Sequence, residues 1–399
     1  MSAPATTELC SAPLDELHMP QRMMGMTTLI AWRNLVHDQV RFVVTLTGIV
    51  FSVVLMGMQS GLLIGFSNAA SGLIDHSRAQ LWMVAKGTQT VDINTPLDES
   101  RRFQALAIPG VRRAEPYLIG FTGWMRPDGG TESVSIVGLE DDAELAGPWN
   151  LVEGTRADLR RPGGVIVDRL YASKLGVKKL GETIEINGHW ARVVGFTEGV
   201  RTFTQSPYVF TSLRQAQTFL RMTPHEAGYV LLTLDDKADP AWVEAQLEAR
   251  IPNVDVFSQA AFSKSSSDYW LYTTGAGISL IISALLGLVV GIAVVTQTLY
   301  ASTMDRLPGY GTLKAMGAPN SYLYRIIVTQ AVMSAAIGYA IGIAIVGILV
   351  LLTQSSTAAP QVTFPLALLL AVLTLAMCIG AAVLSIRKVM TLDPVAVFR

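Results

Sequence analysis

Charge is scarce in this sequence. Only 15% of its 399 residues are Asp, Glu, Lys or Arg, whereas charged residues make up about a quarter of an average soluble domain. The shortage falls in three uncharged runs, residues 42–74, 269–304 and 326–386, while residues 75–268 have an ordinary soluble composition. The chain therefore combines membrane-spanning segments with one water-exposed domain, which excludes an array of two or three soluble domains.

Motifs for catalysis and metal binding are also missing. The five histidines form no HxH or HExxH pattern and the two cysteines form no CxxC pattern, so we expect no metal site. The sequence has no GxSxG motif to supply a serine nucleophile and no GxxxxGK[ST] loop to hold phosphate. We therefore expect no catalytic residue and no cofactor in this chain. Its net charge of −1 gives no reason to expect a nucleic-acid partner.

The uncharged runs predict four transmembrane helices. A helix needs about 20 apolar residues to cross a bilayer, and the third run is long enough for two crossings joined by a turn. The expected fold is membrane α-helical, with an extracytoplasmic mixed α/β domain inserted between helices 1 and 2. The predicted helices are 42–66, 271–300, 326–353 and 364–386, with the inserted domain at 67–270 and an outer turn at 354–363.

Basic residues near the helix ends predict the orientation. They occur before the first helix, in the segment 301–325 and in the tail 387–399, whereas the turn 354–363 has none. Lys and Arg are retained on the cytoplasmic side of a membrane. We therefore expect both termini, including the N-terminal tail 1–26, to be cytoplasmic.

Residues 27–41 have the pattern of an amphipathic helix lying at the membrane surface. Trp32 suits the interface, and Arg33 and Arg41 lie on the polar face. The helix could serve as an anchor only, or as a contact surface as well.

Glycines recur every four residues in the first predicted transmembrane helix, at Gly57, Gly61 and Gly65. This spacing lets helices pack closely in lipid. The alternative is that a membrane helix simply tolerates glycine.

The inserted domain shows alternating strand patterns and helical patterns. Asn187-Gly188 is typical of a two-residue hairpin turn. Strands are predicted at 81–84, 133–138, 165–167, 183–186, 191–196 and 229–234, and helices at 97–107, 168–175, 212–221 and 241–250.

The segment 303–319, TMDRLPGYGTLKAMGAP, predicts a short cytoplasmic helix between Pro308 and Gly317 that exposes aromatic and basic groups. The stretch YGTLKAMGAPNSYLYRII resembles the LKAxG segment of FtsX/MacB-like ABC transporter permeases, with Leu323 at the apolar position after the glycine. The ending LDPVAVFR resembles the DPxxxxR ending of that family, and residues 29–59 are similar to the opening of its DevC-like branch. The chain departs from many relatives at Pro308-Gly309-Tyr310-Gly311, where they carry an acidic residue.

The resemblance implies a permease subunit in a bacterial inner membrane. A separate ABC ATPase would bind ATP and Mg and dock on the coupling segment 301–325, at Asp305, Arg306, Tyr310, Leu313, Lys314 and Met316. The resemblance further implies a homodimer that exports a lipid or other amphiphile with a periplasmic adaptor and an outer-membrane channel.

Two other classes of function stay open from the sequence. The wider family includes mechanotransmitting signalling proteins that activate an external peptidoglycan hydrolase, but their outer domains are smaller than this one. A receptor or membrane-bound enzyme would need a cytoplasmic output domain or a catalytic constellation, and the sequence suggests neither.

Overall fold

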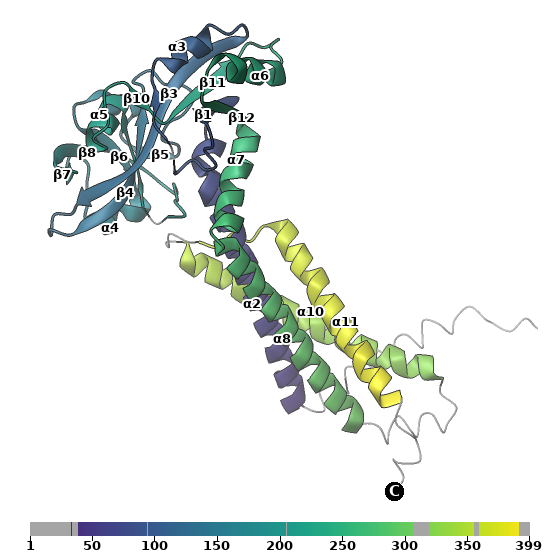
Figure 1. Cartoon of the computed structure of the whole chain (residues 1–399). Coiled ribbons are helices and arrows are strands. Elements are labelled where there is room, and N and C mark those ends of the chain that lie inside the picture. The colour runs from purple at the N-terminus through teal and green to yellow at the C-terminus, as the bar shows by residue number, and fades with distance from the viewer. Residues whose placement is uncertain are drawn as a thin grey trace, which may run out of the picture. The chain divides into compact units, whose positions relative to one another are not determined.

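The computed structural model describes residues 33, 39–93, 95–204, 206–305, 319–354 and 359–390 (Figure 1). Within these residues the chain forms two compact units. One, the helix bundle, contains the residues up to Gly57, residues 284–346 and the residues from 364 onward. The other, the domain unit, contains residues 58–283 and 347–363.

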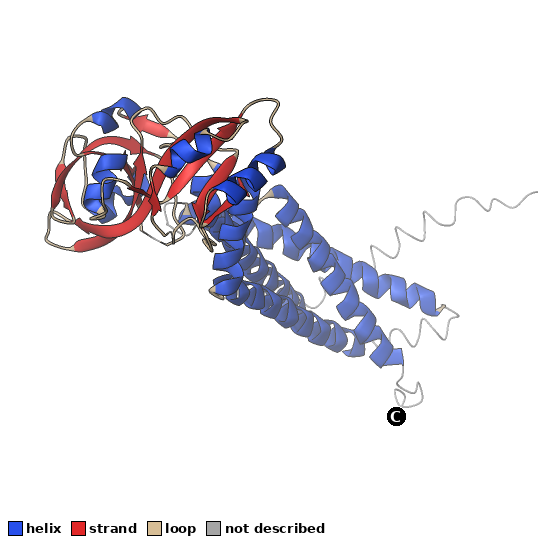
Figure 2. Ribbon diagram, turned by 45° about the horizontal axis from the view of Figure 1, so that its top comes forward, coloured by secondary structure: helices blue, strands red, loops and turns tan. Residues whose placement is uncertain are grey.

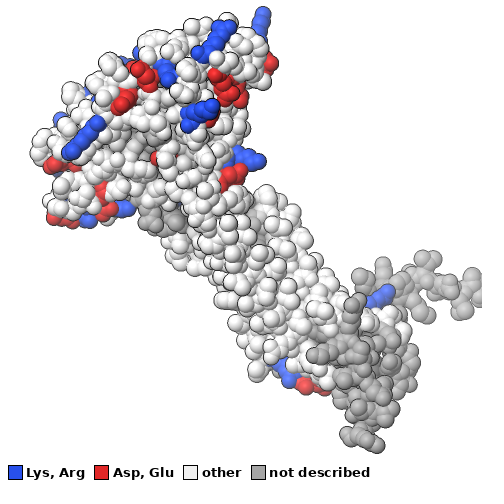
Figure 3. Space-filling view, in the orientation of Figure 1, with Lys and Arg blue, Asp and Glu red and all other residues white. Residues whose placement is uncertain are grey.

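Four helices in the described residues are long and apolar enough to cross a membrane. They are α2 (Gln39–Asp75), α8 (Ala276–Asp305), α10 (Asn320–Thr353) and α11 (Phe364–Met390). In Figure 3 charged side chains are frequent on the inserted domain and almost absent from the surface of these helices. The predicted fold class, four long apolar helices with a mixed α/β domain between the first and the second, is confirmed.

Helix α2 continues beyond the predicted end at residue 66. It runs without interruption for 37 residues, because residues 67–74 contain no proline that would break the helix. Helix α8, in contrast, begins later than predicted. Residues Tyr269–Thr273 form a π-helical turn, η3, and Gly275 follows in a left-handed conformation with φ +77°. Helix α8 therefore starts at Ala276, after this turn.

The helix bundle has a core built from all four long helices. Ile49 and Val53 of α2 are fully buried there with Val295 of α8 and with side chains of α10 and α11. Glycines bring the backbones together, since a Cβ atom at Gly338 would lie 2.5 Å from Ile49 and one at Gly342 would lie 2.7 Å from Val53. Such close contacts between small and branched residues are typical of helices packed in lipid.

The inserted domain is built on one curved, mixed sheet (Figure 2). Its strand order is β12-β1-β11-β3-β4-β9-β6-β8-β5, and β7 pairs with both β3 and β8. Most pairs are antiparallel, but β4–β9 and β6–β8 are parallel. The strands are β1 (Leu81–Ala85), β3 (Val111–Met125), β4 (Thr131–Leu139), β5 (Leu151–Glu153), β6 (Gly164–Asp168), β7 (Thr183–Ile186), β8 (His189–Thr197), β9 (Tyr208–Ser212), β11 (Tyr229–Leu234) and β12 (Val254–Ser258). A separate two-stranded sheet pairs β2 (Leu97–Asp98) with β10 (Glu226–Ala227).

Helices cover the sheet and close its hydrophobic cores. Helix α5 lies so close to the sheet that a Cβ atom at Gly120 of β3 would be 2.7 Å from Leu220, and one at Gly138 of β4 would be 2.5 Å from Ala216. A further core surrounds Trp82, whose ring contacts the rings of Tyr117, Tyr229 and Phe262. The helical elements are α3 (Arg101–Leu106), η1 (Arg156–Arg160), η2 (Arg169–Tyr171), α4 (Ala172–Leu175), α5 (Leu213–Phe219), α6 (Pro240–Arg250) and α7 (Gln259–Asp268).

All six predicted strands are present, and the hairpin is confirmed by the positive φ angles of Asn187 and Gly188. The predicted helix 97–107 is shorter, because residues 97–98 pair as β2, and the helix 168–175 is divided into η2 and α4. The elements that were not predicted are the strands β2, β3, β5, β9, β10 and β12 and the helical elements η1 and α7. Strand β3 is the longest of these at 15 residues, and Pro116, Gly120 and Gly123 hide its pattern.

Candidate functional site

Two residues of the predicted cytoplasmic surface form an ion pair in the helix bundle. Asp305 is the last residue of α8, and its carboxylate pairs with the guanidinium of Arg41 near the start of α2. The other proposed coupling residues, Arg306, Tyr310, Leu313, Lys314 and Met316, lie outside the described residues, as does Trp32; Arg33 is helical. The structure thus pairs Arg41 of the predicted surface helix with Asp305 of the predicted coupling segment. The functional roles of both residues stay predictions.

The glycine series of α2 meets different kinds of neighbour along the helix. In the helix bundle, a Cβ atom at Gly57 would lie 3.1 Å from Val346 of α10. In the domain unit, the nearest neighbours of Gly61 and Gly65 are Pro360 at 3.2 Å and the carbonyl oxygen of Ala359 at 2.5 Å. The packing role of the three glycines stays a prediction, and at the last two the close neighbour is an extended segment rather than a helix.

Hydroxyl groups connect α2, α7 and the loop 88–93 in the domain unit. We call this region the neck; it comprises residues 67–76, 88–93 and 259–273. The hydroxyls of Ser265, Ser266 and Ser267 donate to the carbonyl oxygens of Gln89 at 2.9 Å, Ala70 at 3.1 Å and Ser67 at 3.2 Å, respectively. Three consecutive serines thus bind one helix and one loop to α7. Nothing in the sequence signals this role, because Ser-Ser-Ser is also typical of a solvated loop.

Within the neck, a second set of hydrogen bonds connects η3 and the sheet to the loop 88–93. The indole N–H of Trp270 donates to the Thr90 hydroxyl at 2.9 Å, and that hydroxyl lies 3.0 Å from the Ser266 hydroxyl. The Tyr229 hydroxyl donates to the carbonyl oxygen of Val91 at 2.8 Å. The π-helical turn that precedes α8 is therefore tied to the same loop as α7.

Asp92 is a buried carboxylic acid in the neck loop. Asp92 is only 5% exposed, and its Oδ2 atom has no hydrogen-bond partner among the described residues. Burial raises the pKa of Asp92 to about 7, although hydrogen bonds from the Trp270 and Thr90 side chains lower it. The side chain therefore changes its charge within the physiological pH range.

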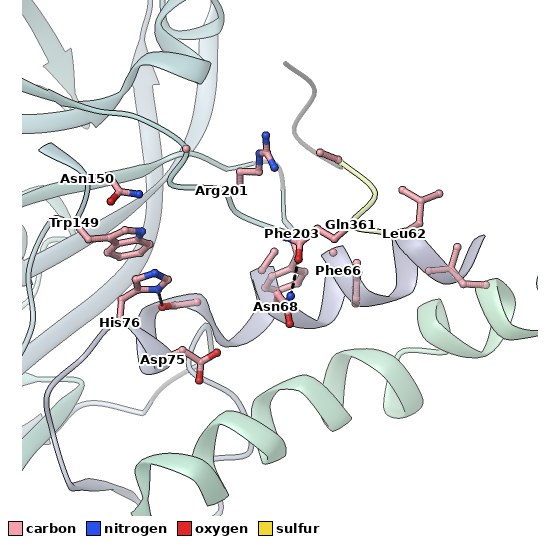
Figure 4. A pocket seen from close by; sticks show the side chains of 16 residues that line it. Leu62, Phe66, Asn68, Asp75, His76, Trp149, Asn150, Arg201, Phe203 and Gln361 are labelled. Carbon is pink, nitrogen blue, oxygen red and sulfur yellow. Dashed lines mark hydrogen bonds between the residues drawn. The ribbon is translucent and has the colours of Figure 1, made fainter. Parts of the chain in front are cut away.

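Beside the neck lies a cavity of about 530 Å³ in the domain unit, shown in Figure 4. We call it the α2 cavity. One face of α2 forms its floor, and loops of the inserted domain and the segment before α11 form its walls. The floor residues are Leu62, Gly65, Phe66, Asn68, Ala69, Gly72, Asp75 and His76, and the walls contain Trp149, Asn150, Gly199, Arg201, Phe203, Leu280, Ala359 and Gln361.

Several side-chain contacts fix the shape of the α2 cavity. The His76 ring stacks on Trp149 with 4.2 Å between the ring centroids. Further along the helix, the amide of Asn68 donates to the side-chain oxygen of Gln361 at 2.7 Å, as the dashed line in Figure 4 shows. Sequence reasoning did not identify this cavity, because its walls come from segments far apart along the chain.

Among the described residues, no three His, Cys, Asp or Glu side chains come together in a way that could hold a metal ion. The described residues of the domain unit thus offer a polar joint and a cavity.

Two family profiles match the chain. The MacB-like periplasmic core domain matches residues 42–250, which is more than half of the chain, and the FtsX-like permease C-terminal domain matches residues 281–394. Together they extend from the first long helix to the last.

Similar proteins cover nearly the whole chain. An ABC transporter permease of Mycobacterium tuberculosis strain H37Rv is 24% identical over 373 residues, which is 92% of this chain and 98% of the relative. An ABC transporter permease of Mycobacterium bovis is 23% identical over 88% of this chain and 93% of the relative.

Among solved structures, the periplasmic region of MacB from Actinobacillus actinomycetemcomitans is 12% identical with a TM-score of 0.36, covering 48% of this chain and 94% of that one. The extracellular domain of the transporter YknZ from Gram-positive bacteria is also 12% identical, with a TM-score of 0.34, and covers 45% of this chain and 99% of that one.

Proposed function

Because the chain belongs to the FtsX/MacB-like family of ABC transporter permeases, we propose that it transmits ATP-driven motion across the membrane to its periplasmic domain. The chain is a multi-pass permease subunit, and ATP is hydrolysed by a partner ATPase. In the proposed cycle the ATPase acts on the segment 301–325 from the cytoplasm. The transmembrane helices then carry the movement outward.

The continuity of α2 is the observation that carries this proposal. The helix is unbroken from Gln39 to Asp75, and its last residues are held in the neck by the serines of α7. A helix of 37 residues is about 55 Å long, which exceeds the roughly 30 Å of a bilayer core. A displacement of α2 along its axis therefore reaches the inserted domain without passing through a flexible linker.

We further propose the setting in which this motion is used. The chain would act as a homodimer of the DevC-like branch in a bacterial inner membrane, with both termini cytoplasmic. The basic residues of 301–325 and 387–399 support this orientation. The cargo would be a lipid or other amphiphile, passed on with a periplasmic adaptor and an outer-membrane channel.

The docking of the ATPase is tested by co-purification of the full-length chain with the ABC ATPase of its own gene neighbourhood. Tyr310→Ala and Lys314→Glu should abolish co-purification or uncouple transport from ATP hydrolysis. Lys237→Gln, which changes an exposed basic residue of the inserted domain outside the segment 301–325, should leave both unchanged. Normal ATPase binding and normal export in both docking variants would refute the proposed site. Activation of a peptidoglycan hydrolase without export would instead favour the signalling alternative.

A further inference from the structure

The floor of the α2 cavity includes three small residues, Gly65, Ala69 and Gly72, on one face of the helix. Leu62, Gly65, Ala69, Gly72 and His76 follow one another at spacings of three or four residues, which places them on one side of the helix. At Gly72 an added Cβ atom would have no neighbour within 4 Å. At Gly72 the helix therefore leaves room that an ordinary side chain would fill, whereas Gly65 is covered by the carbonyl group of Ala359.

The two ends of the α2 cavity differ in polarity. Leu62, Phe66 and Leu280 line one end and come from uncharged runs of the sequence. Asn150 lines the other end, beside the stacked His76 and Trp149, and Arg201 lies between the two ends, in the part of the cavity that contains Phe203 and Asn68 (Figure 4). From residue 62 to residue 76 the helix advances by about 21 Å, which is close to the length of an extended fatty acyl chain.

Arg201 is a cation whose hydrogen bonds are incomplete. One of its terminal nitrogens, Nη2, donates to the carbonyl oxygen of Gln354 at 2.6 Å. Its Nε atom is buried and has no hydrogen-bond partner, and Arg201 has no ion-pair partner among the described residues. A buried donor without an acceptor costs free energy, and a guanidinium binds an anionic oxygen more strongly than a neutral one.

The other charged residue of the cavity already has a partner. Asp75 accepts a hydrogen bond from the Ser71 hydroxyl at 2.6 Å. In Figure 4 the side chains of Asp75 and Arg201 lie on opposite sides of the α2 ribbon. Arg201 is therefore a charged side chain of the cavity that has no partner of opposite charge among the described residues.

We propose that the α2 cavity binds an amphiphile, with its acyl tail along Leu62, Phe66 and Leu280 and its anionic headgroup beside Arg201. This inference rests on the proposed function, since it gives the proposed cargo a binding site on the chain. An acyl chain with an anionic headgroup is common to membrane phospholipids and to exported amphiphiles, so the experiment has to separate the two sources.

The test is binding of lysophosphatidylglycerol to the full-length chain in maltoside detergent, counted by native mass spectrometry. We expect one saturable site, with lysophosphatidylcholine binding about tenfold more weakly because it cannot supply a net anionic headgroup to Arg201. Glycerol phosphate, which has the anion but no tail, should bind at least about 100-fold more weakly because it buries no apolar surface.

Two variants separate this cavity from general lipid adhesion. Gly72→Phe should fill the cavity and weaken binding of lysophosphatidylglycerol at least about tenfold. Gly380→Phe is the matched control, because Gly380 is a helix glycine of α11 that also has no neighbour within 4 Å of an added Cβ atom. Arg201→Gln should lower the affinity for lysophosphatidylglycerol to that for lysophosphatidylcholine and leave the latter unchanged.

The sources are separated by the lipid that co-purifies with the chain. A diacyl phospholipid present in the unaltered protein and lost from Gly72→Phe would identify a membrane lipid as the occupant. Saturable lysolipid binding to a chain that carries no co-purified phospholipid would identify an exported amphiphile, and both results support the site.

Unchanged affinity in Gly72→Phe, or equal affinities of the unaltered chain for the two lysolipids, would overturn the proposal. These measurements use the permease without ATP. A negative result would therefore refute the lipid site but would not bear on the proposed coupling to the ATPase. Conversely, loss of the ATPase contact at Lys314 would leave the lipid affinities unchanged.

Discussion

The helix bundle is held together mainly by close packing, and the neck mainly by hydrogen bonds. In the bundle, backbones approach at glycines such as Gly338 and Gly342, where apolar side chains of the opposite helix fill the space, and the buried hydroxyl of Ser52 adds a hydrogen bond to the carbonyl oxygen of Gly287 at 2.6 Å. In the neck, serine hydroxyls bond directly to the backbone carbonyls of other elements. Lipid tails are as apolar as leucine, so a membrane bundle gains stability from close packing rather than from the hydrophobic effect.

The difference indicates which region can change shape. Packing contacts between helices can slide, because each depends only on shape and distance. A buried hydrogen bond is lost as a whole when its partners separate, and the unpaired group costs about 1–3 kcal/mol. We therefore expect the neck to move as one piece and the bundle contacts to rearrange.

The largest expected effect is a pH dependence of stability, which should be present in the domain that carries Asp92 of the neck. Because the pKa of Asp92 is raised from 3.8 to about 7, the folded chain binds a proton more tightly than the unfolded chain between these values. The free energy of unfolding of the domain should therefore fall as the pH rises from about 4 to about 7, by a total on the order of 4 kcal/mol. Asp92→Asn should remove this part of the pH dependence, and Asp236→Asn, at an exposed turn, should not. Thermal unfolding between pH 4 and pH 8 measures the difference, and parallel curves for Asp92→Asn and the unaltered chain would contradict it.

The second-largest effect is expected for a substitution that disturbs the packing of the helix bundle. An added Cβ atom at Gly291 would lie 2.2 Å from the Ser52 hydroxyl oxygen and 2.7 Å from the Ser52 Cβ atom. Gly291→Ala should therefore destabilise the bundle by about 3 kcal/mol, the upper part of the range for overpacking. Gly380→Ala, where the added atom meets open space, is the matched control. Denaturant unfolding in detergent measures both, and equal stabilities of the two variants would show that close packing at Gly291 does not hold the bundle.

In the neck, Ser266→Ala should cost about 2 kcal/mol, because it leaves the buried carbonyl oxygen of Ala70 without its hydroxyl donor. Ser279→Ala removes an exposed hydroxyl that bonds only within its own helix, so its effect should stay within about 0.5 kcal/mol. Unfolding midpoints in detergent compare the two. A cost of less than about 0.5 kcal/mol for Ser266→Ala would contradict the clamping role of the serines.

The smallest effect is expected at the Arg41–Asp305 ion pair. The two side chains are 36% and 59% exposed, and an exposed pair contributes about 0.2–1 kcal/mol. A double-mutant cycle with Arg41→Ala and Asp305→Ala should give a coupling energy in that range, which decreases with added salt. No measurable coupling at low salt would mean that the pair does not join α2 to α8.

The membrane part of the fold could be predicted because its physical signal is local. The four long helices follow from uncharged runs, and the Asn187-Gly188 hairpin follows from the φ angles that its turn requires. Strand β3 could not be predicted, since Gly120 occurs where helix α5 approaches the sheet, and that approach is not visible along the chain.

The candidate site was harder to predict than the fold for a similar reason. The bond from Ser266 to Ala70 joins residues 196 positions apart, and no sequence pattern signals it. The unmet hydrogen bond of Arg201 is defined only by what surrounds its side chain. From the sequence we proposed which segment receives the motion and which domain moves, but we did not predict the neck or the α2 cavity.

Hydrogen–deuterium exchange on the intact permease–ATPase complex tests the central claim, transmission of ATP-driven motion to the periplasmic domain, most directly. Exchange is compared without nucleotide and with a non-hydrolysable ATP analogue. We expect exchange to change around Gly275, where the neck ends and α8 begins, while residues 259–273 of the neck stay protected. Changes confined to the cytoplasmic segments, with none between residues 259 and 280, would contradict the transmission of motion to the inserted domain.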